Sequence, residues 1–415
     1  MIAAGGLLIL YFWLRLSLFP VMDGQPAGPR LKIMIGGRLI IYRALWGMTL
    51  ELLLLLIGYR FFAAAGVPDA VLARNAVCGV VLVLLLLANG ILRIFFTSRR
   101  LSIVLRVVML LTMWVPVVNL VVLWYACRLV YEEYDFACHK RDVHLTRADS
   151  DLCKTKYPLV MVHGVLFRDL KYFNYWGRVP KELTRYGATV HYGNQEAVGT
   201  VERNGRDIRD KVLRVLEETG CEKVNIIAHS KGGLDARYAV STLGLADKVA
   251  SLTAIGVPHR GCRFIDMACG LIPESLYRRL ANLVDSTFRK LGDENPDFYT
   301  AIRQFRTRDS EELSRQMPDA PGVYYQSYMS KMKSPLSDPL LALPYLIIYP
   351  LEGENDGLVS TQSANWGDYK GMLAAKGQRG VSHGDIIDLK REDYKGFDVL
   401  EAYISIVSDL KNLGF

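Results

Sequence analysis

The chain has 415 residues, of which 51% are hydrophobic and 22% are charged, and its formal net charge is +8. This length suffices for two or three domains. The positive excess lies in the first third, because residues 1–135 carry 12 Lys and Arg against 6 Asp and Glu. These positive residues flank apolar runs and form no stripe with aromatic residues, so they indicate membrane topology and argue against a nucleic-acid partner.

The first third, residues 1–135, predicts a membrane module of about four transmembrane helices, at residues 2–19, 44–66, 75–97 and 102–130. About 20 apolar residues span the hydrocarbon core of a bilayer. Two charged residues, Glu51 and Arg60, fall inside the second segment. An acid within a membrane segment is a candidate for transport or proton relay. Because both residues stand near helix ends, snorkelling or local pairing is the favoured interpretation.

The positive residues of the loops set the expected orientation. Those between the first two helices and those between the third and fourth place both loops in the cytoplasm and both chain ends outside. Lys140, Arg141 and Arg147 follow the last helix closely and argue for the opposite. We therefore expect a multi-pass protein of the cell membrane, with its C-terminal domain slightly favoured on the extracytoplasmic side.

A polar linker at residues 136–156 precedes a domain with a different pattern. Short apolar runs predict strands at residues 158–162, 187–192, 224–228, 249–255 and 344–349. An amphipathic helix is expected at 203–219, and strands that alternate with helices predict a mainly parallel sheet over 157–415. Residues 263–300 interrupt this rhythm with leucines at helical spacing. They form either an ordinary packed helix or a helical lid-like insertion that opens onto lipid.

A five-residue motif, Ala228-His229-Ser230-Lys231-Gly232, lies between a predicted strand and a predicted helix. It is a variant of the G-x-S-x-G nucleophile elbow, in which a sharp strand-to-helix turn exposes the serine hydroxyl. Small residues two before and two after the serine let the strand and the helix pass without a clash of side chains. Ser230 is therefore the candidate nucleophile.

A serine hydroxyl is a weak nucleophile and needs a base, which in turn needs an orienting acid. After an elbow of this kind the chain order is Ser, then Asp or Glu, then His. Of the seven histidines only His383 lies beyond the last plausible acid loop. Asp356 precedes a turn glycine shortly after the expected strand 344–349. The predicted catalytic residues are therefore Ser230, Asp356 and His383.

An oxyanion hole requires two backbone N–H groups. One is expected from Lys231, the residue after the nucleophile, and the other from Val165 in the loop after the first strand. His163 in the same loop is an alternative base. It precedes the elbow by far, so a structural role is favoured for it.

Residues 157–262 and 338–388 resemble the bacterial family I true lipases, which are secreted triacylglycerol lipases with an α/β-hydrolase fold. The matching stretches are Val162-His163-Gly164, Asn204-Gly205, Lys223-Val224-Asn225, His229 to Gly233, Gly256 to Gly261 and Asn355 to Ser360. The resemblance implies Ser230 as nucleophile, Asp356 as acid and His383 as base. Ala228 stands where that family usually has Gly and Lys231 where it usually has Gln. Nothing in the family corresponds to residues 1–135.

The resemblance also implies a structural calcium ion, whereas no organic cofactor is expected. The implied ligands are Asp338, in an Asp-Pro step, and Asp385, two residues after His383. Two carboxylates with backbone carbonyls suit a hard cation. The alternative is that Asp338 begins a turn and Asp385 is solvated.

Together these patterns predict a membrane-anchored serine ester hydrolase, a lipase or esterase, that acts on lipid or acyl esters through an acyl-enzyme. An acyltransferase or a phospholipase would use the same triad. A non-catalytic membrane scaffold is the alternative of another class, and the presence of all three triad residues argues against it. The expected partners are the ester substrate and the bilayer, and the sequence leaves the oligomeric state open.

Overall fold

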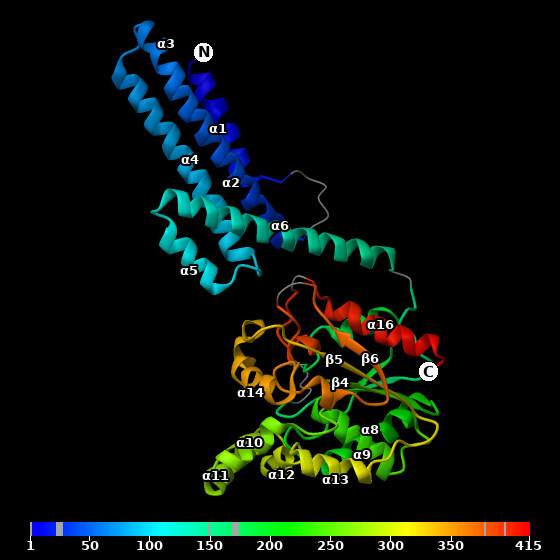
Figure 1. Ribbon diagram of the computed structural model, residues 1–415. Helices are drawn as coiled ribbons and strands as arrows, with labels where there is room; N and C mark the ends of the chain where they lie inside the picture. Colours follow the sequence, from blue (N-terminus) through cyan, green and yellow to red (C-terminus); the bar gives the residue numbers. More distant parts are fainter. Residues whose placement is uncertain (1, 22–27, 148–149, 168–173, 377–378, 394–395) are drawn as a thin grey trace. The chain divides into compact units, whose positions relative to one another are not determined.

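A computed structural model describes residues 2–21, 28–147, 150–167, 174–376, 379–393 and 396–415 (Figure 1). The chain divides into two compact units, Met1–Ala148 and Asp149–Phe415. All regular secondary structure described in the first unit is helical. The second unit contains the sheet and every residue of the predicted catalytic site.

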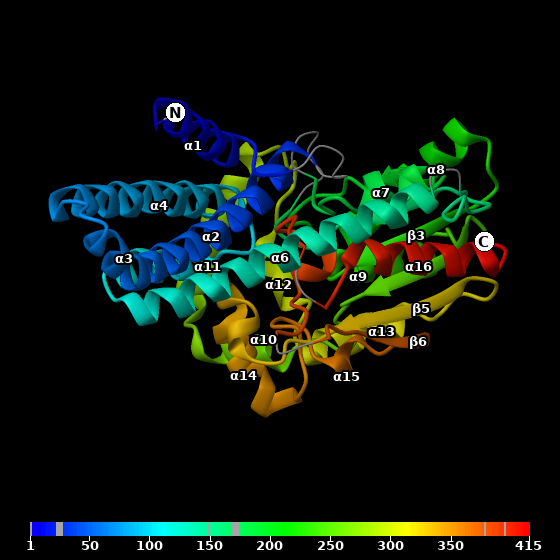
Figure 2. The same cartoon turned by 90° about the horizontal axis from the view of Figure 1, so that it is seen from above.

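Seven helical elements make up the first unit. They are α1 (Ile2–Leu18), α2 (Pro29–Leu53), the π-helix η1 (Leu54–Gly58), α3 (Tyr59–Ala64), α4 (Asp69–Thr97), α5 (Ile103–Thr112) and α6 (Pro116–Thr146). Helices α2 and α4 run side by side (Figure 1, Figure 2). They approach closely at Gly37 and Gly90, where a Cβ on either glycine would lie 2.8 Å from the carbonyl oxygen of the other. Small residues at such a contact let two apolar helices pack backbone to backbone.

Two helical stretches of the described residues, not four, are long and apolar enough to cross a membrane: Pro29–Phe62 and Asp69–Thr97. The expectation of four spans is therefore corrected. The predicted helix 102–130 is interrupted after α5, because Pro116 begins a separate helix. Proline is well suited to the first turn of a helix but not to its interior. Helix α6 then continues to Thr146, so the first part of the predicted linker 136–156 is helical.

Glu133 of α6 joins three elements at one end of the first unit. One carboxylate oxygen accepts from Arg30 Nη1 at 2.6 Å, near the start of α2. The other accepts from Ser98 Oγ at 2.7 Å and from the backbone N–H groups of Arg99 and Arg100 at 3.0 and 3.2 Å, after the end of α4. A buried carboxylate with this many donors is fully paired.

The second unit is built on a six-stranded sheet in the order β2-β1-β3-β4-β5-β6, with every neighbouring pair parallel. The strands are β1 (Leu159–Val162), β2 (Val190–Tyr192), β3 (Val224–His229), β4 (Val249–Ile255), β5 (Tyr324–Ser330) and β6 (Asp368–Leu373). The parallel sheet and its helical crossovers are those of an α/β-hydrolase fold. The first four strands confirm the predictions at 158–162, 187–192, 224–228 and 249–255.

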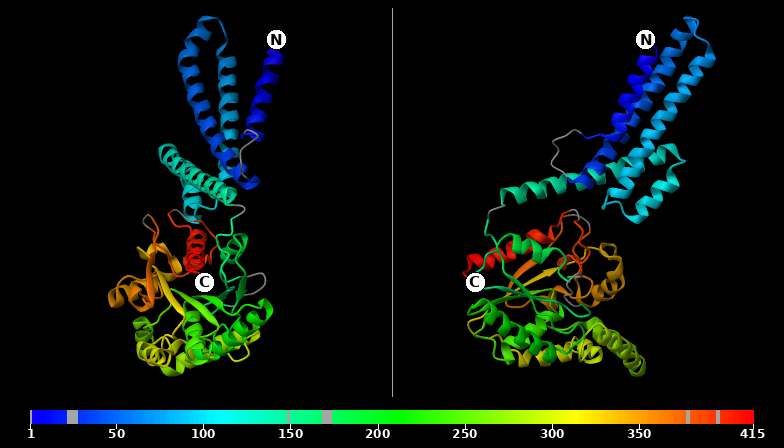
Figure 3. Two further views of the ribbon diagram at one scale, coloured as in Figure 1. Left: turned by 90° about the vertical axis from the view of Figure 1, so that its right-hand side faces the viewer. Right: turned by 180° about the vertical axis from the view of Figure 1, so that it is seen from behind.

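Helices cover both faces of the sheet (Figure 1, Figure 3). Alternate residues of β1 point to opposite faces. Leu159 and Met161 pack in a cluster with α7 (Val179–Arg185) and α16 (Val399–Asn412), whereas Val160 and Val162 pack in one with α8 (Val201–Thr219) and α9 (Lys231–Thr242). Because both clusters bury apolar side chains of β1 and β3, these two central strands are fixed on both faces.

The predicted strand at 344–349 is wrong, because this segment lies in helix α14 (Ala342–Glu352). A short apolar run fits a buried strand and a helix equally well. The strands β5 and β6 were not predicted. Strand β5 mixes Tyr and Met with Gln and Ser, and one buried amide nitrogen is paired across the sheet: Gln326 Nε2 donates to Thr253 Oγ1 at 2.8 Å.

Two long crossovers carry most of the remaining helices. Between β4 and β5 lie α10 (Arg263–Leu271), α11 (Glu274–Lys290), α12 (Phe298–Arg303) and α13 (Thr307–Gln316). Between β5 and β6 lie the 3₁₀ turns η2 (Pro335–Ser337) and η3 (Pro339–Leu341), then α14 and α15 (Thr361–Ala364). Residues 263–300 are thus a helical insertion. Its first helix, α10, packs against α14 of the other crossover.

Candidate active site

Ser230 occupies the turn between β3 and α9, in the backbone conformation φ 54°, ψ −132°. A residue with a side chain pays about 1–3 kcal/mol for such a conformation, so surrounding contacts must impose it. The Ser230 N–H donates to Ile255 O of β4 at 3.0 Å. On the other side of the turn, a Cβ on Gly232 would overlap the carbonyl oxygens of Val162 and His163. The elbow therefore needs glycine at position 232.

The loop after β1 lies directly against the serine. A Cβ on Gly164 would come within 3.0 Å of Ser230 Cβ. Leu166 in this loop has φ 66°, and its N–H donates to Ala197 O at 2.8 Å. Left-handed backbone at a bulky residue is rare and marks a conformation held by its surroundings.

His383 and Asp356 form a short, buried hydrogen bond. His383 Nδ1 lies 2.7 Å from Asp356 Oδ2, and the His383 N–H donates to Asp356 O at 2.9 Å. The second carboxylate oxygen, Oδ1, accepts from the N–H groups of Leu358 and Val359 at 3.0 and 2.9 Å. These two donors orient the carboxylate, and with Nδ1 occupied, Nε2 is the ring nitrogen left to accept a proton from a hydroxyl.

Gly256, which directly follows β4, lies against Asp356, His383 and His229. A Cβ there would lie 3.4 Å from Asp356 Oδ2, and 3.6 Å from both His383 Cε1 and His229 Nε2. The ring centroids of His229 and His383 are 4.4 Å apart, and His229 directly precedes Ser230. The fold thus places the His383–Asp356 pair beside His229, the residue that directly precedes Ser230.

His229 is a neighbour of the site that the sequence reasoning did not assign. It is fully buried, and its Nδ1 lies 2.6 Å from Tyr175 Oη. Burial, and to a smaller extent the charge of His383, lower the pKa of His229 well below 6.5. His229 is therefore neutral at neutral pH, so it adds no positive charge beside His383. The sequence shows that His229 precedes Ser230 in the motif, but it does not show that His229 packs on His383.

The two expected oxyanion donors stand on opposite sides of the serine. Lys231 is the first residue of α9, where helical N–H groups have no partner within the helix. Val165 lies in the loop after β1. Neither backbone N–H donates a hydrogen bond to any residue in the part of the chain that the structure describes.

His163 is held in a structural position. Its Nδ1 lies 2.8 Å from Gly164 O and its Nε2 lies 3.1 Å from Gln195 O. Both ring nitrogens face backbone carbonyls, so the geometry gives His163 no role as a base toward Ser230.

The side chain of Lys231 is buried and paired within α9. Its Nζ lies 2.5 Å from Asp235 Oδ1, and Asp235 Oδ2 accepts from Asn204 Nδ2 at 3.0 Å. Burial raises the pKa of Asp235 to about 6, against the opposing effect of the Lys231 cation. The ammonium that replaces the family's usual Gln is thus neutralised inside the fold.

Asp338 and Asp385, the residues implied as calcium ligands, already accept hydrogen bonds from cationic side chains. Lys390 Nζ lies 2.8 Å from Asp338 Oδ2, and Arg379 Nη2 lies 2.9 and 3.0 Å from the two oxygens of Asp385. Among the described residues no group of three or more His, Cys, Asp or Glu is arranged to hold a metal ion. In this arrangement the two carboxylates do not fit a calcium site.

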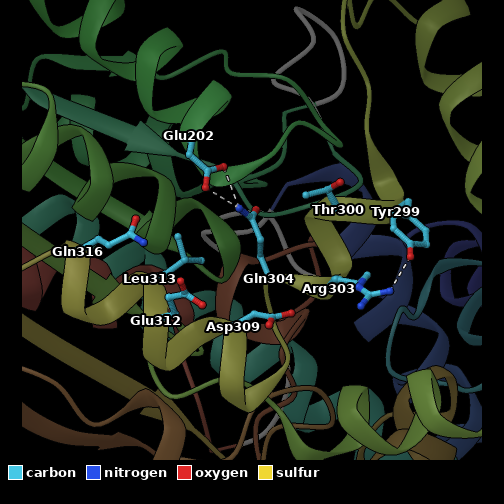
Figure 4. A pocket seen from close by; sticks show the side chains of 9 residues that line it. All are labelled: Glu202, Tyr299, Thr300, Arg303, Gln304, Asp309, Glu312, Leu313 and Gln316. Atoms are coloured by element: carbon cyan, nitrogen blue, oxygen red, sulfur yellow. Dashed lines mark hydrogen bonds between the residues drawn. The ribbon is translucent and has the colours of Figure 1, made fainter.

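A separate pocket of about 330 Å³ lies among α8, α12 and α13 (Figure 4). It is lined by Glu202, Tyr299, Thr300, Arg303, Gln304, Asp309, Glu312, Leu313 and Gln316. Gln304 Nε2 donates to both carboxylate oxygens of Glu202, at 3.0 and 2.8 Å. None of the predicted catalytic residues lines this pocket, so it is distinct from the candidate active site.

Comparison with known proteins gives similarity to lipases. A family model described as lipase (class 2) matches residues 156–266. A triacylglycerol lipase of Vibrio cholerae is 31% identical over 239 residues, which cover 52% of this chain and 75% of that enzyme. Triacylglycerol lipase 2 of Saccharomyces cerevisiae is 28% identical over 272 residues, which cover 60% and 78% of the two chains.

Among solved structures, the mature form of the Bacillus licheniformis lipase BlEst2 aligns with a TM-score of 0.47 and 18% identity, over 61% of this chain and 92% of that one. The family-model match runs from before β1 into α10. It includes the serine elbow but neither Asp356 nor His383.

Proposed function

The chain belongs to the triacylglycerol lipase family and is a carboxylic ester hydrolase, and we propose that it hydrolyses lipid esters with Ser230, His383 and Asp356 as its catalytic triad. The observation that supports this proposal is the packing of His383, paired with Asp356, against His229, the residue that directly precedes the strained Ser230. Acyl transfer requires a nucleophile, a base close to it and an acid that orients the base.

In the proposed reaction Ser230 Oγ attacks the ester carbonyl carbon, and His383 Nε2 takes the hydroxyl proton. Asp356 stabilises the imidazolium that forms. The N–H groups of Lys231 and Val165 donate to the oxyanion. As the tetrahedral intermediate collapses, the proton passes from His383 to the leaving alcohol, and the acyl group remains on Ser230. Water then repeats the sequence, which releases the carboxylic acid and restores the serine.

Exposed apolar side chains on the two long crossovers support a water-insoluble ester as substrate. On η2, η3 and α14 these are Leu336, Leu340, Leu343 and Leu346, and on α10 and α11 they are Leu271, Leu276, Leu280 and Leu283. Leu340 and Leu343 are 85% and 68% exposed. Large exposed apolar groups are costly in water and are typical of surfaces that contact lipid or protein. The first crossover follows β4, the strand beside β3 and its Ser230 turn, and the second contains Asp356.

We also propose that the helices Pro29–Phe62 and Asp69–Thr97 anchor the chain as a transmembrane hairpin. Arg30 stands at the start of the first helix, and Arg93, Arg99 and Arg100 stand at or after the end of the second. By the positive-inside rule this end of the hairpin lies in the cytoplasm. With two spans, the chain leaves the membrane on the cytoplasmic side before it forms the hydrolase unit. This side is opposite to the one expected from four spans. Release of the full chain from membranes by an alkaline wash would contradict the anchor.

Replacement of the nucleophile tests the proposed chemistry. We expect the full-length enzyme to hydrolyse a series of nitrophenyl esters and to react with a fluorophosphonate probe, and Ser230→Ala to lose both activities, because no other group carries the acyl chain. Ser241→Ala, on the same helix, is the matched control and should keep both. Hydrolysis that survives in Ser230→Ala at the wild-type rate rules out this nucleophile.

The exposed leucines give a second test, which concerns the substrate alone. We expect Leu340→Ser combined with Leu343→Ser to lower the rate on long-chain esters in vesicles by on the order of tenfold, because two apolar contacts with lipid are lost. The rate on a soluble short-chain ester should not change. Leu213→Ser, at an exposed position of α8, is the control. An equal loss on both substrates would show a damaged active site in place of a lost lipid contact.

A further inference from the structure

We propose that an internal pair of cations, Lys390 and Arg379, takes the place of a structural calcium ion and braces the loop that carries His383. The inference starts from the carboxylates of Asp338 and Asp385. Their side chains are 4% and 2% exposed, so each needs a cation or several donors close by. The chain supplies both from its own residues.

Each carboxylate oxygen of the pair already accepts at least one hydrogen bond. Asp338 Oδ2 accepts from Lys390 Nζ at 2.8 Å and from Ser382 Oγ at 2.9 Å, and Asp338 Oδ1 accepts from Leu340 N at 3.2 Å. Asp385 Oδ1 accepts from Arg379 Nη2 at 2.9 Å, and Asp385 Oδ2 accepts from Arg379 Nη2 at 3.0 Å and from Ser382 N at 3.1 Å. Lys390 Nζ also lies 4.0 Å from Asp385 Oδ1.

Charge balance and geometry both oppose a calcium ion here. The two carboxylates are matched by one ammonium and one guanidinium, so the cluster is neutral as it stands. A calcium ion placed among them would leave an excess of two positive charges in a largely buried site. Calcium also takes 6–8 oxygen ligands at about 2.3–2.6 Å, and these oxygens are already turned toward N–H and O–H donors. The cations therefore exclude the ion rather than assist it.

The cluster acts on the catalytic loop through Ser382, the residue before His383. Its N–H and Oγ are bonded to Asp385 and Asp338. A further ion pair joins the far end of the same loop to the main body of the second unit: Arg178 Nε and Nη2 lie 2.8 and 2.7 Å from the two oxygens of Asp388. Ion pairs at both ends thus fix the backbone on which His383 stands. Lys390 and Arg379 are positioning residues, because they act on His383 through Asp338, Asp385 and Ser382.

Hydrogen–deuterium exchange of the full-length protein in detergent tests this brace, with peptides from residues 379–393 as the readout. In the wild type, exchange of these peptides should be the same with a chelator and with millimolar calcium. In Lys390→Met the buried carboxylates keep only one cation, so exchange in the loop should rise by about tenfold. Lys390→Arg retains the charge and should restore slow exchange.

Lys248→Met, at a surface lysine beside Asp247, is the matched control and should leave the loop unchanged. Faster exchange of the wild-type loop in chelator, or slower exchange in calcium, overturns the proposal. Wild-type exchange in Lys390→Met overturns it as well. If Lys390→Met does not fold, the wild-type comparison alone decides. The readout does not depend on catalysis, so it stands even where Ser230 proves not to be the nucleophile.

Discussion

The serine elbow and the histidine loop hold their catalytic groups by different physical means. The elbow relies on shape: Ser230 adopts a strained backbone conformation, and Gly232 leaves room for the carbonyls of β1. The histidine loop relies on charge, through the pairs Arg379–Asp385, Lys390–Asp338 and Arg178–Asp388. The elbow is joined to the sheet directly, whereas the loop follows the last strand and is tied by its start to the segment after β5, through the bridge between Met332 and Gly380.

This difference predicts different failures. A steric change should disrupt the elbow, and the size of its effect should not depend on pH or salt, because packing carries no charge. A charge change should affect the histidine loop and leave the elbow in place. The three predictions that follow separate these two cases.

The largest effect is expected from Asp356→Asn. This change removes the charge that stabilises the His383 imidazolium and lets the amide favour the wrong ring tautomer, so kcat should fall by about ten-thousandfold. The fold should persist, because the amide oxygen can still accept the Leu358 and Val359 N–H groups. Asp247→Asn, at an exposed position, is the control for kcat. A variant that retains more than a tenth of the wild-type kcat would remove Asp356 from the triad.

Gly232→Ala should destabilise the elbow by about 2 kcal/mol, because the new Cβ overlaps the carbonyl oxygens of Val162 and His163. Pulse proteolysis of the full-length protein in urea measures the loss. Gly270→Ala is the matched control, since a Cβ on Gly270 of α10 meets nothing within 4 Å. That variant should be as stable as the wild type or more so, because alanine favours a helix. If the two variants have the same free energy of unfolding, the elbow is not held by the close packing of Gly232.

The smallest effect concerns acid. Although burial raises the pKa of Asp338, hydrogen bonds from Lys390 and Ser382 bring it below its ordinary 3.8. Because the pKa is lower in the folded than in the unfolded chain, Asp338 contributes stability above pH 3.8 that is lost as the pH falls through the folded value. The protection factors of the 379–393 peptides, which compare the observed exchange rate with the intrinsic rate at the same pH, should therefore fall a few-fold on acidification. Asp338→Asn should remove this fall, and a fall of the same size in that variant would contradict it.

Much of the elbow could be predicted from the sequence because its determinants are local. Five consecutive residues between an apolar run and a helix define it, and four of the six strands were visible as apolar segments. Strand β5 lacks an apolar run, because Gln326 and two serines interrupt its aromatic residues, and the pairing of Gln326 with Thr253 across the sheet cannot be read from the sequence. The apolar run at 344–349 predicts a strand but forms a helix, because periodicity alone does not separate a short helix from a strand.

The surroundings of His383 could not be predicted in the same way. Lys390 is 52 positions from Asp338 and Arg178 is 210 positions from Asp388, so no local pattern links either pair. The positive φ of Leu166 likewise reflects its tertiary setting and not its residue type. In the first unit, Pro116 was the readable signal that the last predicted membrane helix is broken.

The layout of the crossovers has a consequence for how this enzyme can diversify. Helices α10–α13 leave from β4 and return to β5, and η2 to α15 leave from β5 and return to β6, so each insertion starts and ends on neighbouring strands. Their length and sequence can change without any change in strand order or in the register of β3 with β4. Loops of other lengths can therefore be grafted in place of α10 and α11 to recruit new esters, whereas Phe305 and Leu313 of the same crossover belong to the core cluster of Leu234 in α9 and have to be kept.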